Sequence, residues 1–95
     1  MKDLHFEWDK NKDRQNIAKH GVSFDTALLV FGDESRIVLF DDEHSDHEDR
    51  YITVGSIDGF IVILMVVYTE EDDTIRIISA RKADKKEREE YLQWQ

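Results

Sequence analysis

The pattern of apolar and polar positions changes from a helical to a strand period about one third of the way along the chain. Asp9 is a helix-capping residue type and predicts a first helix through about Lys19, ending at Gly21 because glycine tolerates a left-handed backbone. Ser23 predicts the N-cap of a second helix, in which apolar residues follow the i, i+3, i+4, i+7 spacing of one helix face. These residues are Phe24, Ala27, Leu28 and Phe31, with Gly32 as the stop.

The following half of the chain is rich in β-branched and aromatic residues, which favour strands. Four strands are predicted, at residues 36–40, 50–55, 60–68 and 74–80. Short polar turns at 56–59 and 70–73 separate the last three strands, so these are expected to form an antiparallel meander. Residues 82–92 have helical propensity and predict a C-terminal helix. The order indicates an α+β domain: two N-terminal helices, a four-stranded, mainly antiparallel sheet and a C-terminal helix, with the helices on one face.

Length and composition favour a single domain over residues 1–95, because 95 residues with 40% hydrophobic positions hold one core and show no linker. The sequence has no cysteine, which excludes disulfides and thiolate metal sites. The longest apolar run, residues 60–68, is far shorter than the roughly 20 residues of a membrane-spanning helix. Because the start of the chain also lacks an apolar signal segment, we expect a cytoplasmic protein without a membrane partner.

Charge is distributed unevenly along the chain. The formal net charge is −9, yet residues 76–88 hold six basic against two acidic side chains, which gives this segment +4 and the remainder −13. Arg76 shares a strand face with apolar neighbours and either pairs with a carboxylate of an adjacent strand or contributes to a phosphate-binding rim. Arg81 and Lys82, expected just beyond the strand end, would complete that rim. The later basic residues, Lys85, Lys86 and Arg88, are typical of a solvated helix face.

The stretch DDEHSDHED, residues 41–49, joins two predicted strands and holds six carboxylates and two histidines. Oxygen-rich clusters bind hard divalent cations, but this stretch lacks the glycine and ligand period of an EF-hand loop. A solvated loop is therefore the favoured interpretation, and no metal site is predicted. Elsewhere, His20 in the triplet KHG offers a general acid or base, or alternatively a helix-end capping group. No Walker loop, GxSxG or HExxH motif is present, which excludes those enzyme classes.

Three stretches resemble, in order and spacing, the BrnT family of bacterial type II toxins. They are FEWDKNKDRQNIAKHGVSFDTALLVF (6–31), HSDHEDRYITVG (44–55) and IRIISARKADKKEREEY (75–91). The resemblance implies a RelE-like fold and a metal-independent endoribonuclease, without a cofactor, that arrests growth. It also implies a hetero-oligomer with a neutralising BrnA-like ribbon-helix-helix antitoxin, through which alone the toxin would reach operator DNA.

Cleavage of RNA requires a base near the ribose 2′-hydroxyl, cations at the phosphorane-like transition state and an acid for the 5′-oxygen. The resemblance implies six site residues: Arg76, Arg81, His20 and Lys19 as catalytic groups, and Lys82 and Tyr91 as RNA-binding groups, the tyrosine by stacking. Two positions depart from the family pattern, because Glu71 and Phe60 stand where arginine and another basic residue are usual. A second hypothesis is therefore a catalytically weakened binding module that serves as antitoxin partner and corepressor.

Overall fold

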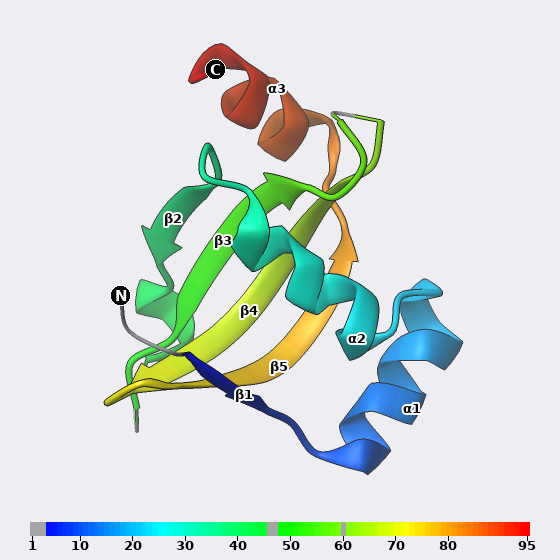
Figure 1. Ribbon diagram of the computed structural model, residues 1–95, viewed down its shortest axis with the longest axis vertical. Coiled ribbons are helices and arrows are strands. Elements are labelled where there is room, and N and C mark those ends of the chain that lie inside the picture. Colours follow the sequence, from blue (N-terminus) through cyan, green and yellow to red (C-terminus); the bar gives the residue numbers. More distant parts are fainter. Residues whose placement is uncertain (1–3, 46–47, 60) are drawn as a thin grey trace.

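The computed structural model describes residues 4–45, 48–59 and 61–95. Its elements are β1 (His5–Glu7), α1 (Lys10–His20), α2 (Phe24–Ala27), the 3₁₀ helix η1 (Leu28–Gly32), β2 (Ile37–Phe40), the 3₁₀ helix η2 (Asp42–His44), β3 (Tyr51–Ser56), β4 (Ile63–Glu71), β5 (Thr74–Lys82) and α3 (Lys85–Gln93). The strands form one sheet in the order β1-β5-β4-β3-β2 (Figure 1). The α+β class and the antiparallel meander of β3, β4 and β5 are confirmed.

The sheet has a strand that the hydrophobic pattern did not predict. β1 pairs in parallel with β5, with Phe6 opposite Ile75, so the sheet is five-stranded and mixed. Three residues are too few to display a period of two, which explains why this strand was missed. The predicted second helix is also shorter: α2 has one turn, capped by Ser23, and the chain continues as the 3₁₀ helix η1.

Helices cover both faces of the sheet, and the prediction of a single covered face is wrong. On β4, Leu64 packs with Phe24 of α2, whereas its neighbour Met65 packs with Tyr91 of α3. Successive residues of a strand point to opposite faces, so α2 and α3 lie on opposite sides. We call these the α2 face and the α3 face. Among the described residues, no helix is long and apolar enough to cross a membrane.

A β-bulge interrupts the alternation of β5. Ser79 lies opposite Val67, but Ile77 lies opposite the next residue of β4, Tyr68, so Ile78 is an extra residue without a partner. β5 then continues to Lys82, so the last two predicted cations of the rim lie within the strand and not beyond its end.

The bulge places Arg76 and Arg81 on the same face of the sheet. Five positions separate them, an odd number that would put them on opposite faces of a regular strand. In the structure Arg76 lies opposite Thr69 and Arg81 opposite Met65, both on the α3 face. Ala80, predicted to share a face with Arg76, is instead 1% exposed in the core of the α2 face.

Asn16 joins α1 to the outer edge of β5. Its side-chain amide donates to the carbonyl oxygens of Val22 (2.8 Å) and Ala80 (2.7 Å), and its Oδ1 accepts from the Ala80 amide at 3.1 Å. The amide thus satisfies both backbone groups of Ala80 as a neighbouring strand would, beyond the last pair with β1. Asn16 is 6% exposed, so water has little access to these bonds.

Tyr91 anchors α3 to the sheet. Its side chain is fully buried, and its hydroxyl donates to the Asp33 carboxylate at 2.5 Å. Asp33 also accepts from the backbone amides of Ser35 and Ser56, each at 2.9 Å. One carboxylate therefore connects the end of η1, the end of β3 and the last helix.

We expect the protein to lose stability in acid partly through Asp33. Burial acts to raise the pKa of this carboxyl, but the hydrogen bonds from Tyr91, Ser56 and Ser35 outweigh it and hold the pKa below its ordinary value. Such a group stabilises the fold above its unfolded-state pKa of about 4, and this contribution disappears as the pH falls through the lower folded-state pKa. The measurement is the free energy of urea unfolding between pH 2 and 7.

Below pH 4, the free energy of unfolding should decrease less steeply in Asp33→Asn than in the parent chain, because the variant has no carboxyl to protonate at this site. Asp25→Asn, which removes an exposed carboxylate, serves as the matched control and should keep the parental slope. Equal slopes in all three proteins would contradict the assignment.

Candidate functional site

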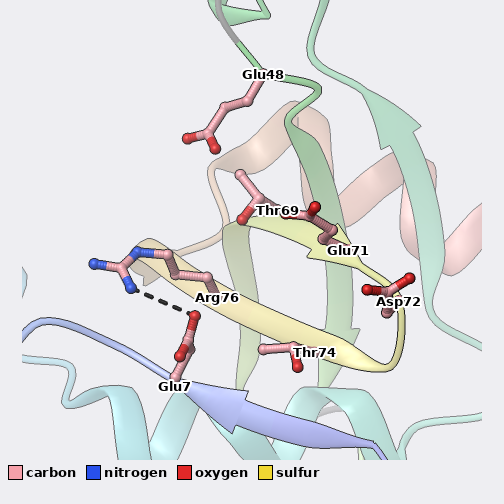
Figure 2. A pocket seen from close by; sticks show the side chains of 7 residues that line it. All are labelled: Glu7, Glu48, Thr69, Glu71, Asp72, Thr74 and Arg76. Atoms are coloured by element: carbon pink, nitrogen blue, oxygen red, sulfur yellow. Dashed lines mark hydrogen bonds and ion pairs between the residues drawn. The ribbon is translucent and has the colours of Figure 1, made fainter.

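Two pockets lie where the α3 face is open. The Arg76 pocket has a volume of about 300 Å³ and is lined by Glu7, Glu48, Thr69, Glu71, Asp72, Thr74 and Arg76 (Figure 2). The Arg81 pocket has a volume of about 340 Å³ and is lined by Asp41, Glu43, His44, Arg50, Ile52, Met65, Val67, Ile78, Ser79 and Arg81. Each pocket thus takes one of the two predicted catalytic arginines from β5.

The Arg76 pocket is acidic. Figure 2 shows its arginine reaching toward Glu7, with an Nη1 to Oε1 distance of 3.5 Å between two well-exposed side chains. Such an exposed ion pair contributes little energy. Four of the seven lining residues carry carboxylates, and Glu71 is one of them. This arrangement agrees with the first interpretation of Arg76, pairing with a carboxylate of an adjacent strand, and repels a phosphate.

In the Arg81 pocket the arginine has a fixed orientation. Its Nη1 and Nη2 donate to the two carboxylate oxygens of Glu87 at 2.8 and 3.0 Å, and Nη1 also donates to the Lys82 carbonyl at 3.1 Å. Glu87 belongs to the capping box of α3, where it accepts from the Asp84 amide at 2.9 Å. A guanidinium fork that binds a carboxylate in this way presents the geometry that also binds phosphate.

The connection between β2 and β3 supplies the other wall of the Arg81 pocket. The Asp41 amide donates to the Arg50 carbonyl at 2.8 Å, the Ser45 hydroxyl donates to the Asp41 carbonyl at 2.5 Å, and the Arg50 amide donates to the Ser45 hydroxyl at 3.0 Å. His44 lies within this closed loop, with Nδ1 3.1 Å from Asp41 Oδ2. Residues 46 and 47 of the predicted solvated loop lie outside the described residues.

Asp41 and the Nε atom of the partly exposed Arg50 are buried in this wall. The Nε of Arg50 is buried and has no hydrogen-bond partner within the part of the chain that the structure describes. Asp41 is 9% exposed. Across residues 4–45, 48–59 and 61–95, no group of three or more metal-ligating side chains is arranged to hold a metal ion.

The structure does not bring the remaining predicted residues to these pockets. Lys19 and His20 end α1, and the chain that follows them packs on the α2 face through Val22. Lys82 is exposed and lies opposite Leu64, a residue of that same α2 face. A proton-transfer role for the first two and an RNA-binding role for the third stay predictions without support from this geometry.

The predicted stacking role of Tyr91 is wrong. Its ring is 0% exposed beneath α3 and packs against Val54, Ile63 and Met65, so no base can reach its face. Burial and the hydrogen bond to Asp33 also raise the pKa of its hydroxyl, which keeps the group neutral. Tyr91 therefore holds the scaffold of the site.

The sequence did not predict three residues of the Arg81 pocket as site residues: Asp41, His44 and Arg50. A weak signal was available, because the histidine follows an aspartate by three residues in a stretch that predicts a loop. The arginine was simply the first residue of a predicted strand. Their approach to Arg81 depends on how the loop folds back over β3 and β4, which no local pattern reveals.

One comparison with known proteins gives a match. A family model described as "Ribonuclease toxin, BrnT, of type II toxin-antitoxin system" matches residues 8–87. A search among curated proteins gives no match. The matched segment contains every residue that lines the Arg81 pocket and ends at Glu87, the partner of its arginine.

Proposed function

The chain belongs to the BrnT family of ribonuclease toxins of type II toxin–antitoxin systems, and on this premise we propose that it is a metal-independent endoribonuclease that cleaves RNA in the Arg81 pocket and thereby arrests growth. The observation that carries the choice of site is the arrangement of this pocket. It gathers two guanidinium groups and an imidazole, against two carboxylates, over a largely apolar floor formed by β3, β4 and β5.

Arg81 is the residue that we assign to the scissile phosphate. Its guanidinium is preoriented, and two parallel N–H donors match two phosphate oxygens, whose negative charge increases in the transition state. The bound phosphate replaces the carboxylate of Glu87 on this fork. Arg76 and Arg81 lie opposite residues of β4 that are four positions apart, about 13 Å along the strand, so Arg76 does not reach the phosphate at Arg81.

The antitoxin that a type II system implies is, in this proposal, a BrnA-like ribbon-helix-helix protein. It covers the α3 face with acidic side chains at the Arg81 pocket, and so competes with RNA for the guanidinium groups of that pocket. The resulting hetero-oligomer binds operator DNA through the antitoxin. The excess of positive charge in residues 76–88 of a chain with net charge −9 supports this choice of surface. Because the proposed substrate is cellular RNA and the antitoxin binds operator DNA, the proposal assigns both proteins to the cytoplasm.

Glu71→Arg tests the proposal against the alternative of a weakened binding module. Glu71 lines the Arg76 pocket, so the substitution replaces a repulsive carboxylate by a cation beside the expected path of the RNA. We expect about a tenfold faster cleavage of a fluorescent RNA in the presence of EDTA, equivalent to about 1.4 kcal/mol.

The matched control is Glu70→Arg, which makes the same change of charge on an exposed neighbour. Glu70 lies opposite Ile75 and therefore points to the α2 face, so it should accelerate cleavage much less. Equal gains in both variants would mean that only net charge matters. Absence of cleavage in the parent chain and in both variants would support the binding module.

A further inference from the structure

We propose that His44, oriented by Asp41, is the general base of RNA cleavage, and that Arg50 is the second cation on the reacting phosphate. This inference rests on the proposed ribonuclease function and assigns the proton-transfer step within the same pocket. It replaces His20 and Lys19, which lie at the end of α1 away from the Arg81 pocket, in the role of proton-transfer groups.

The contact between His44 and Asp41 determines which ring nitrogen can act as a base. Nδ1 lies 3.2 and 3.1 Å from the two carboxylate oxygens. An ionised carboxylate only accepts, so Nδ1 carries the proton and the lone pair of the neutral ring is on Nε2. The Asp41 side chain is 11% exposed and the His44 side chain 61% exposed. A shielded carboxylate behind an accessible imidazole is the arrangement that orients a general base.

The position of this pair is fixed relative to β3. The hydrogen bonds that link Asp41, Ser45 and Arg50 close the loop on itself immediately before Tyr51, the first residue of the strand. His44 is therefore held in a ring of bonded residues whose end belongs to the sheet. A base must be placed within hydrogen-bond reach of the proton that it removes, and such a frame provides this constraint.

The buried Nε atom of Arg50 is the strongest evidence that the pocket binds an anion. A buried N–H group without an acceptor destabilises the fold, more so when it belongs to a charged side chain, and the Nε of Arg50 is such a group among the described residues. A phosphate oxygen in the pocket supplies the acceptor. Because Arg81 lines the same pocket, one phosphate bound there contacts guanidinium groups from both walls.

The reaction follows from these placements. The 2′-hydroxyl transfers its proton to Nε2 of His44 while the 2′-oxygen forms a bond to phosphorus. The bond from phosphorus to the 5′-oxygen breaks, and this oxygen takes a proton from water. The products are a 2′,3′-cyclic phosphate and a 5′-hydroxyl. Arg50 and Arg81 stabilise the additional negative charge on the non-bridging oxygens during this step.

The test is single-turnover cleavage of a short RNA by the full chain in EDTA. His44→Gln should lower the rate about 100- to 10,000-fold, the range for loss of a general base, while the affinity for uncleavable 2′-deoxy substrate changes less than twofold. His5→Gln, which replaces an exposed histidine of β1, is the matched control and should keep the parental rate. Asp41→Asn should also slow cleavage, because its amide cannot hold the same tautomer.

A substrate with sulfur in place of the 5′-oxygen separates base from acid. A thiolate leaves without needing a proton. A variant that lacks the general base therefore still cleaves this RNA slowly, whereas a variant that lacks the general acid regains the parental rate. Persistently slow cleavage by His44→Gln supports the proposal, and restoration of the rate overturns it. If His44→Gln cleaves ordinary RNA at the parental rate, this inference fails while the ribonuclease function stands. If neither the parent chain nor Glu71→Arg cleaves, both fail.

Discussion

Arg81→Ala is expected to lower the rate of RNA cleavage by about two to three orders of magnitude, the effect of removing one preorganised donor from a charged transition state. The guanidinium already binds two carboxylate oxygens in the geometry that two phosphate oxygens require. Its loss removes both donors and a full charge from the pocket. Single-turnover rates on RNA measure the effect, and growth arrest on induction should weaken in parallel.

Two further variants make this result specific. Arg88→Ala removes the same charge from an exposed position of α3 and should leave the rate within about twofold, because screened surface charges act weakly over such distances. Arg81→Lys keeps the charge without the fork and should give an intermediate rate. Equal losses in Arg81→Ala and Arg88→Ala would show that net charge alone matters and would contradict the assignment.

Asn16→Ala is expected to cause the largest loss of stability, about 3 kcal/mol of unfolding free energy, because it leaves three buried backbone groups without partners. A domain of this size has a total stability of about 5–15 kcal/mol. The corresponding decrease in Tm is about 12–24 °C. Thermal unfolding followed by circular dichroism measures it.

The neighbouring variant Gln15→Ala provides the comparison, since this side chain lies on the exposed side of α1 and should change stability by less than about 0.5 kcal/mol. A decrease in Tm for Asn16→Ala no larger than that for Gln15→Ala would show that water replaces the three bonds and that α1 does not depend on this contact.

The elements that the sequence predicts well are the long apolar strands and the helices with a clear capping residue. Residues 63–71 and 74–82 form strands near their predicted places, and the capping residues Asp9 and Ser23 begin helices as expected. β1 was missed because its three residues gain their conformation from pairing with β5, which is distant in sequence. Local propensity is a weak guide wherever tertiary contacts decide the structure.

The candidate site was predictable only in part. The local excess of basic residues indicated Arg81 as a site residue, and this side chain lines a pocket in the structure. Arg76 had the same signal but lies among carboxylates that come from β1, β4 and the chain before β3. His44 belongs to a stretch whose composition suggests a solvated loop, and Arg50 is the first residue of a predicted strand, so neither was predicted to belong to a site. The hydrogen bonds that close this loop involve backbone groups and a serine, which composition does not reveal.

Because of the extra residue in β5, side chains before and after the bulge follow opposite alternations between the two faces of the sheet. Before Ile78 one parity of residue number faces α3, and after it the other parity does. The surface on which Arg81 appears is therefore set by a count of residues, and not by any property of arginine. Among related sheets, gain or loss of one residue at this point exchanges an entire row of side chains between the α2 face and the α3 face. Alignment of this single position thus decides which basic residues of two relatives are chemically equivalent.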